Sequence, residues 1–303
     1  MIEPSVTRRE ALKTAAMAGL MLPLAAALPR LDGQGTPPTD ALKPSQPLFE
    51  LGIATVTFKK LSVDAVIAAL QELQVKSVSA FKVHVPILLS TPDVCREMAQ
   101  KFRAAGIAIA STGVVQLANS ESVMRRAFEC GRAAGLPMMT ASFAQPPDRD
   151  TLLLTERFVR EYDIRLAFHN HGPEDKIFPS PYDAWNAVQP YDERLGLCID
   201  VGHSARAGVD PVEAILKCRA RLYDVHLKDT RAAVGAVPDI PVELGFGRLD
   251  IPAILAALVQ VGFRNQVGLE DEVESADPIP GVAQSFGFMR GVRAALSRNR
   301  PLP

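Results

Sequence analysis

Two histidines separated by one residue are the first candidates for chemistry in this sequence. His169 and His171 follow a short apolar run, residues 166–168, and a Gly-Pro pair at Gly172 comes directly after them. The apolar run is typical of a buried strand that ends at the Gly-Pro pair. Because side chains alternate along a strand, both imidazoles should lie on one side and Asn170 on the other. Two imidazoles at a strand end can bind a metal ion, and two ordinary surface histidines are the alternative.

Further polar residues that could take part in chemistry fall at the ends of other apolar runs. His84, His203 and His226 complete the five histidines of the chain, and each ends or closely follows such a run. Asp200 ends the run before His203, and Glu270 ends another. Charged groups are expensive to bury unless they are paired or bind a metal. We therefore expect one polar site, built around a metal ion or, as the alternative, a hydrogen-bonded polar plug.

Four of these residues, two histidines and two acids, form the candidate metal site: His169, Asp200, His226 and Glu270. Together they would offer two nitrogen and two carboxylate ligands to one divalent ion. Mixed ligands whose charge balances that of the ion suit Mn²⁺, Co²⁺, Fe²⁺ or Zn²⁺ better than Ca²⁺.

The elements that must position these residues repeat regularly along the chain. Eight apolar runs are predicted to be strands, at residues 50–58, 77–85, 107–115, 137–143, 164–171, 195–201, 222–227 and 266–271. Eight segments with helical periodicity follow them, at residues 62–73, 92–104, 120–134, 150–162, 181–188, 211–220, 251–261 and 281–296. Eight alternations predict a single-domain α/β fold, a (β/α)8 TIM barrel over residues 49–297, with residues 298–303 as a tail. Active sites of such barrels lie at the C-terminal ends of the strands, where all the candidate residues fall.

A doubly wound open sheet is the alternative architecture, because alternation alone does not show that a sheet closes. The count of eight and the scatter of polar residues over several strand ends favour the barrel. No Gly-x-Gly-x-x-Gly follows the first strand, so a dinucleotide-binding fold is not expected.

The composition is that of a single large domain with a proper core. The chain has 303 residues, of which 48% are hydrophobic and 22% charged, and its formal net charge is −1. Without a basic excess, neither a nucleic acid nor an anionic membrane surface is expected as a partner. The four cysteines contain no Cys-x-x-Cys pair and are expected to be buried free thiols: Cys95, Cys130, Cys198 and Cys218.

The first residues of the chain have the pattern of an export signal. The pair Arg8-Arg9 precedes an apolar run over residues 14–28, which ends near three alanines. This pattern predicts a twin-arginine signal peptide over residues 1–28 and a periplasmic location, without stable membrane insertion after cleavage. Residues 29–48, rich in Pro, Gly and Thr, would form a flexible leader. A cytoplasmic amphipathic tail is the alternative for this N-terminal segment.

The site motifs resemble those of the xylose isomerase-like superfamily of sugar isomerases and epimerases, which also includes endonuclease IV. The similarity covers the whole barrel and rests on four motifs: Phe-His-Asn-His at 168–171, Cys-Ile-Asp-Val-Gly-His at 198–203, Val-His-Leu-Lys-Asp at 225–229 and Gly-Leu-Glu at 268–270. In the superfamily the metal ligands come from strands five to eight, commonly as Glu, Asp, His and Glu.

The resemblance implies Asp200, His226 and Glu270 as the last three of these ligands. His169 stands where many members carry the first glutamate. The fourth ligand is therefore His169 itself, or Glu174 or a water in its place. With one glutamate of the pair replaced, a symmetric two-glutamate epimerisation is less expected.

The resemblance also implies a chemistry, the removal of a proton next to a sugar carbonyl with the help of one divalent metal ion. General acids or bases would be drawn from His171, His203, Glu174 and Glu270. Substrate hydroxyls or an oxyanion would be oriented by Lys82, His84 and Lys228.

The expected substrate is an unphosphorylated keto-sugar or a 3-keto-glycoside, because an exported enzyme would meet sugars without phosphate. The run at residues 169–176 resembles a branch that acts on such glycosides by elimination or hydration. Isomerisation, epimerisation and elimination all remain open, and a homo-oligomer is compatible with each. Two other functions are alternatives: a non-catalytic sugar-binding barrel with a vestigial metal site, and an endonuclease IV-like phosphodiesterase, which would need three zinc ions and more ligands than this chain offers.

Overall fold

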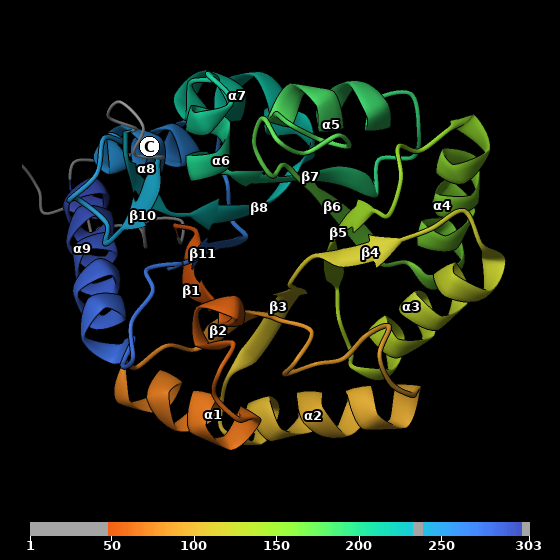
Figure 1. The fold of residues 1–303 in the computed structure, drawn as a ribbon, viewed down its shortest axis with the longest axis horizontal. Coiled ribbons are helices and arrows are strands. Elements are labelled where there is room, and N and C mark those ends of the chain that lie inside the picture. The colour runs from red at the N-terminus through yellow and green to blue at the C-terminus, as the bar shows by residue number, and fades with distance from the viewer. Residues whose placement is uncertain (1–47, 233–238, 299–303) are drawn as a thin grey trace, which may run out of the picture. The chain divides into compact units, whose positions relative to one another are not determined.

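The computed structural model describes residues 48–232 and 239–298, which form a nearly closed barrel of parallel strands with helices around it (Figure 1). The strands of the barrel are β1 (Glu50–Ala54), β2 (Ser77–Ala80), β3 (Ala108–Thr112), β4 (Val115–Leu117), β5 (Met138–Phe143), β6 (Arg165–His169), β7 (Leu195–Asp200), β8 (Leu222–Leu227) and β11 (Gln266–Leu269). The outer helices are α1 (Val63–Glu72), α2 (Pro92–Ala104), α3 (Glu121–Ala133), α4 (Arg149–Tyr162), α5 (Pro181–Val188), α7 (Pro211–Cys218), α8 (Ile251–Gln260) and α9 (Ile279–Arg298). Further elements are the short helix α6 (Val201–Arg206), the 3-10 turns η1 (Thr55–Phe58) and η2 (Arg219–Arg221), and a hairpin of β9 (Asp229–Arg231) and β10 (Ile240–Val242).

The sheet runs in the order β3-β2-β1-β11-β8-β7-β6-β5-β4, with parallel pairing throughout. β3 and β4 are two parts of the third predicted strand, interrupted at Gly113 and Val114. β3 pairs with β2 and β4 pairs with β5, so the interrupted strand links the two ends of the sheet. A Cβ atom on Gly113 would come within 3.1 Å of the Phe81 backbone, so the close approach at this break requires glycine. The predicted barrel is confirmed, and the open doubly wound sheet is excluded.

The first two strands are shorter than predicted. β1 ends at Ala54, and the rest of the predicted strand is the 3-10 turn η1. β2 ends at Ala80, before the loop that contains His84. The Thr55 hydroxyl accepts a hydrogen bond of 2.8 Å from the Phe81 backbone N–H, so a side chain replaces the next backbone pairing between these strands.

Side-chain caps fix where the helices begin. Ser62, Thr91 and Asp210 each accept a hydrogen bond from a backbone N–H in the first turn of the helix that follows. The large apolar side chains pack between strands and helices, and Phe102, Phe128 and Phe158 are fully buried there. The four cysteines are buried free thiols, as predicted. The apolar core therefore lies between the strands and the surrounding helices, and the candidate polar residues lie near the ends of the strands.

The predicted signal peptide lies outside the described residues. So do the leader, apart from Leu48, and the tail beyond Arg298. Among residues 48–232 and 239–298, no helix combines the length and apolar character needed to cross a membrane.

Candidate metal centre

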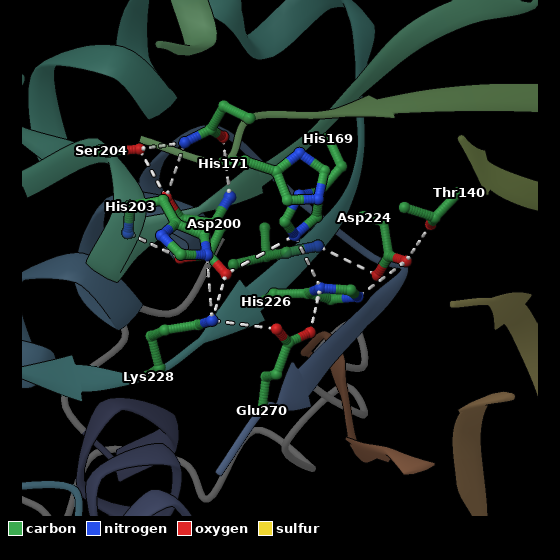
Figure 2. A network of polar contacts seen from close by, with 12 residues as sticks. Thr140, His169, His171, Asp200, His203, Ser204, Asp224, His226, Lys228 and Glu270 are labelled. Atoms are coloured by element: carbon green, nitrogen blue, oxygen red, sulfur yellow. Dashed lines mark hydrogen bonds and ion pairs between the residues drawn. The ribbon is translucent and has the colours of Figure 1, made fainter. Parts of the chain in front are cut away.

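Four side chains from four neighbouring strands meet at the C-terminal rim of the barrel (Figure 2). His169 ends β6, Asp200 ends β7, His226 lies near the end of β8 and Glu270 directly follows β11. These strands are adjacent in the order β6-β7-β8-β11. Each residue has one potential ligand atom within 4.8 Å of those of the other three. The structure thus brings together the four residues that the sequence selected.

Two of the three distances between facing atoms are close to those expected around one small cation, and the third is that of a hydrogen bond. His169 Nε2 lies 3.1 Å from His226 Nδ1 and 3.5 Å from Asp200 Oδ2. His226 Nδ1 lies 2.6 Å from Glu270 Oε2. Tetrahedral ligands that lie about 2.1 Å from a metal ion are separated from each other by roughly 3.4 Å.

The burial and charge of the four residues also fit a divalent ion. None of their side chains is more than 10% exposed. Asp200 Oδ2 has no hydrogen-bond partner among the described residues, although Lys228 Nζ lies 3.1 Å from it, off the hydrogen-bonding direction. A buried carboxylate oxygen left this way is destabilising. If both imidazoles are neutral, as metal binding requires, the two carboxylates give the four residues a charge of about −2, which a divalent cation balances.

The local electrostatics give three of the four residues the protonation state that a metal site needs. Burial lowers the pKa of His169 to about 3, so its ring is neutral with lone pairs available. Burial alone would raise the pKa of Asp200, but Lys228 and His203 outweigh it and keep this carboxyl ionised. The pKa of Glu270 is likewise held well below its usual range by Lys228 and His226, against the effect of burial. Burial acts to lower the pKa of His226, but Cys198 and Glu270 outweigh it and raise this pKa well above its usual value, so a metal ion would have to displace a proton from the ring.

Asn170 positions Asp200 by linking two strand ends. Its side-chain amide donates to the Asp200 carbonyl at 3.1 Å and to the Ser204 hydroxyl at 3.2 Å, and it accepts from the Asp200 N–H at 3.0 Å. Asp200 Oδ1 caps α6 by accepting from the His203 N–H at 2.8 Å. Oδ1 of Asp200 is therefore engaged in the helix cap, and Oδ2 is left facing the site.

Asp224 lies behind His226 and was not among the residues selected from the sequence. It is fully buried, and Thr140 Oγ1 donates to its Oδ2 at 3.0 Å. The same oxygen lies 3.8 Å from His226 Nε2, the ring nitrogen that faces away from the other ligands. This separation is too long for a hydrogen bond, and Nε2 has no hydrogen-bond partner among the described residues, so Asp224 acts on the ring through its charge. A negative charge on that side favours a proton on Nε2, which leaves Nδ1 to ligate. The spacing of two along β8, which places Asp224 and His226 on one face, was the available signal.

Lys228 links the acidic residues of the site to one another. Its buried Nζ lies 2.9 Å from Glu270 Oε1, 2.7 Å from Glu272 Oε2 and 3.3 Å from His203 Nε2. Lys228 therefore holds one oxygen of Glu270 and leaves the other to face His226. Glu272, which is 39% exposed, was also missed from the sequence, although it stands two residues after Glu270.

His171 and His203, the predicted acid–base residues, stand beside the ligands. The His171 ring centre lies 4.4 Å from that of His169, which confirms that the two rings share one side. His171 Nδ1 lies 3.3 Å from Asp175 Oδ2. His203 Nδ1 faces Arg206 at 3.1 Å, and burial lowers the pKa of His203.

Three other predicted residues lie apart from the four-ligand group. His84 is buried away from it, with Nδ1 2.8 Å from Thr55 Oγ1 and Nε2 3.2 Å from the Leu61 carbonyl, so both ring nitrogens are engaged in the fold. Glu174 is 68% exposed and pairs with Arg206, so the structure brings His169 rather than Glu174 to the cluster. Lys82 borders the same cavity as the ligands, on its opposite wall.

A cavity of about 230 Å³ borders the ligands. One wall is polar and consists of His169, His171, His203, His226, Glu270 and Glu272. The opposite wall comes from the ends of β2 and of the interrupted third strand, and includes Lys82 and Gln116. The arrangement offers a candidate cation site, imidazole rings and the ammonium group of Lys82 to a small polar molecule.

Comparison with known proteins identifies a family whose members this chain resembles. The family described as xylose isomerase-like TIM barrel matches residues 67–292. Over 155 residues the chain is 32% identical to the rhizopine catabolism protein MocC of Rhizobium meliloti, an alignment that covers 47% of each chain. The chain thus aligns with about half the length of this curated relative.

Solved structures share the fold. An IolI protein with a bound zinc atom superposes with a TM-score of 0.66 at 15% identity, over 82% of this chain and 99% of that one. A D-allulose 3-epimerase from Methylomonas sp. superposes with a TM-score of 0.62 at 12% identity, over 81% of this chain and 98% of that one.

Proposed function

Because the chain belongs to the xylose isomerase-like TIM barrel family, we propose that it is a divalent-metal-dependent enzyme that removes a proton next to a sugar carbonyl. The proposed substrate is an unphosphorylated keto-sugar or a 3-keto-glycoside. The observation that carries the proposal is the convergence of two imidazole nitrogens and two carboxylate oxygens at one point of the rim.

The residues proposed to hold the ion are His169, Asp200, His226 and Glu270. When bound there, a divalent ion would act as a Lewis acid toward the substrate carbonyl. Mn²⁺, Co²⁺, Fe²⁺ and Zn²⁺ all suit this mixed set of donors. The zinc atom bound by the IolI protein supports a site of this kind on the same fold.

His171 is the proposed general base. Asp175 lies 3.3 Å from its Nδ1, which favours a proton on that nitrogen and leaves Nε2 free to accept another. His171 lines the cavity and is 34% exposed on its side chain, so a substrate carbon can approach it. Its ring stands next to the ligand His169, which places the base beside the polarised carbonyl.

His203 and Lys228 are proposed to act on the oxygens of the substrate. Their side chains lie 3.3 Å apart. His203 lines the cavity, and Lys228 is buried beside it. The ammonium of Lys228 can stabilise negative charge that develops on oxygen as the proton leaves. His203 stands where it can donate a proton to that oxygen or to a leaving group.

Three reactions can follow removal of this proton. The C–H pair next to the carbonyl moves toward the carbonyl oxygen, and the proton passes to His171. Return of a proton to the same carbon on the other face gives epimerisation. Return to the former carbonyl carbon gives isomerisation, if the neighbouring hydroxyl loses its proton and the former carbonyl oxygen gains one. Loss of a β-substituent, which leaves as an alcohol after taking a proton, gives elimination.

The test is proton NMR in heavy water. The metal-loaded protein is incubated with 3-keto-glucosides and with free ketoses, and loss of the C–H signal next to the carbonyl is followed. We expect deuterium incorporation or product formation that stops when a chelator removes the metal. Full metal occupancy without exchange in any of these sugars would instead identify a binding protein.

We also propose export by the twin-arginine signal at residues 1–28. Fusion of these residues to a reporter that is active only after export should give activity, and Arg8→Lys with Arg9→Lys should abolish it. A reporter that stays inside the cell with the native pair would contradict export.

A further inference from the structure

A second, mostly apolar cavity adjoins the one at the metal ligands. Its volume is about 150 Å³. The two cavities share four lining residues: Lys82, Gly113, Val114 and Gln116. These four residues form the boundary between the two cavities, so the second cavity lies next to a molecule held at the polar rim.

The second cavity is lined by aliphatic side chains of one loop and of the strand break. The loop follows β2 and contributes Val85, Ile87, Leu88 and Leu89. Val115 at the start of β4 adds a further apolar side chain. Leu89 is 69% exposed, and water contact with such a side chain is unfavourable unless a ligand or partner covers it.

The two cavities lie side by side, and their linings come from different parts of the barrel. The metal ligands come from β6, β7, β8 and β11, and the apolar lining comes from the ends of β2 and β3. In the sheet order, β2 and β3 lie beyond β1 on the far side of β11 from the other ligand strands (Figure 1). A ligand bound at the metal centre thus has its reacting end on one side of the barrel and its other end near Lys82.

We propose that the second cavity is a subsite for the apolar aglycone of a glycoside whose sugar occupies the metal-centre cavity. This inference rests on the proposed function and narrows its substrate class, from sugars in general to glycosides with aromatic or other apolar aglycones. A free monosaccharide would leave the half-buried Leu88 and the exposed Leu89 in contact with water. Lys82 and Gln116, at the boundary, can bind the glycosidic oxygen or a neighbouring hydroxyl, where the polar and apolar parts of such a molecule join.

The experiment measures binding of unreactive glucosides, so that it does not depend on turnover. Phenyl and methyl glucosides of the same anomeric form are titrated into the metal-loaded full-length protein by calorimetry, for both anomers. Burial of the aromatic ring should make the phenyl glucoside bind about tenfold more tightly for at least one anomer. If the phenyl and methyl glucosides bind the unaltered protein equally well for both anomers, the proposed subsite is refuted.

Two variants test whether the second cavity causes the preference for the phenyl glucoside. Leu88→Ser should reduce the preference for the phenyl glucoside to about twofold or less, because it removes apolar surface from the subsite. Leu153→Ser is the matched control, since Leu153 is 41% exposed on α4 and lines neither cavity. The control should keep the tenfold preference. A preference that survives Leu88→Ser in a folded protein would place the aglycone elsewhere.

Other outcomes separate this inference from the proposed function. A phenyl preference without any deuterium exchange in keto-sugars would sustain the subsite and refute the chemistry. Exchange without the preference would sustain the chemistry and refute the subsite. If a second copy of the chain covered the lining, sedimentation would show a dimer that Leu88→Ser dissociates, and the subsite would be refuted.

Discussion

His226 Nδ1 lies 2.6 Å from Glu270 Oε2, although the two residues are on different strands. The register explains the contact: His226 pairs with Gly268 across β8 and β11, and Glu270 lies two residues further on the same face. An imidazole and a carboxylate held this close, beside the ligand atom of His169, form a site that a divalent ion can complete. The predictions below follow from this arrangement.

Asp224→Asn should weaken metal binding about 10- to 100-fold without changing the fold. The amide keeps the shape of the carboxylate but no longer attracts the proton of His226 Nε2, 3.8 Å away. Competition with a chromophoric chelator measures the affinity. Asp163→Asn, at a side chain that is 82% exposed, is the control and should bind metal as the unaltered protein does. Unaltered affinity in Asp224→Asn would show that Asp224 does not act on the ligand.

His171→Gln should lower deuterium exchange next to the substrate carbonyl by about 10²- to 10⁴-fold while the metal content stays complete. The glutamine has no group that can accept the proton. Asp175→Asn should have a smaller effect in the same direction, because it removes only the group that orients the ring. Exchange at the normal rate in His171→Gln would transfer the role of base to another residue.

Lys228→Met should lower the free energy of unfolding by about 3 kcal/mol in the presence of a chelator. The buried ammonium lies within 3.1 Å of carboxylate oxygens of Asp200, Glu270 and Glu272, and its loss leaves these acids uncompensated. Urea unfolding measures the change. Lys59→Met removes a surface ion pair with Glu274 and should change stability by less than about 0.5 kcal/mol. A similar small loss in Lys228→Met would mean that the acids are not charged in the folded protein.

Asp192 should make the stability of the fold depend on pH in the acidic range. Burial acts to raise its pKa, but hydrogen bonds from Arg160 and Arg194 outweigh it and lower the pKa to about 2. A carboxyl with a lowered pKa stabilises the fold above its unfolded value near pH 4, and this contribution is lost as the pH falls toward 2. Asp192→Asn should therefore be less stable by about 1 kcal/mol at neutral pH, with a difference that shrinks below pH 4. A difference that is constant from pH 7 to pH 3 would contradict this assignment.

Much of the site could be predicted because strand geometry is regular. Alternation along β6 and the position of polar residues at strand ends were enough to select His169, Asp200 and His226 before their separations were known. What could not be predicted depends on contacts between distant segments. His84 was expected at a strand end like the others, but β2 ends at Ala80, and Thr55, 29 residues before His84, contacts its ring.

The break in the third strand has the same kind of cause. The apolar run at residues 107–115 indicates one strand, but Gly113 lies against Phe81 of another loop, and the pairing changes partner there. The apolar cavity beside this break could not be predicted either, because its lining combines a loop and a strand whose approach is a property of the folded barrel.

The most direct test of the central claim is anomalous diffraction from crystals of the full-length protein grown with Mn²⁺ or Zn²⁺. We expect one strong anomalous peak in contact with His169 Nε2, Asp200 Oδ2, His226 Nδ1 and Glu270 Oε2. A saturating metal concentration that gives no peak among these four atoms, or a peak bound by Glu174 with His169 turned away, would contradict it.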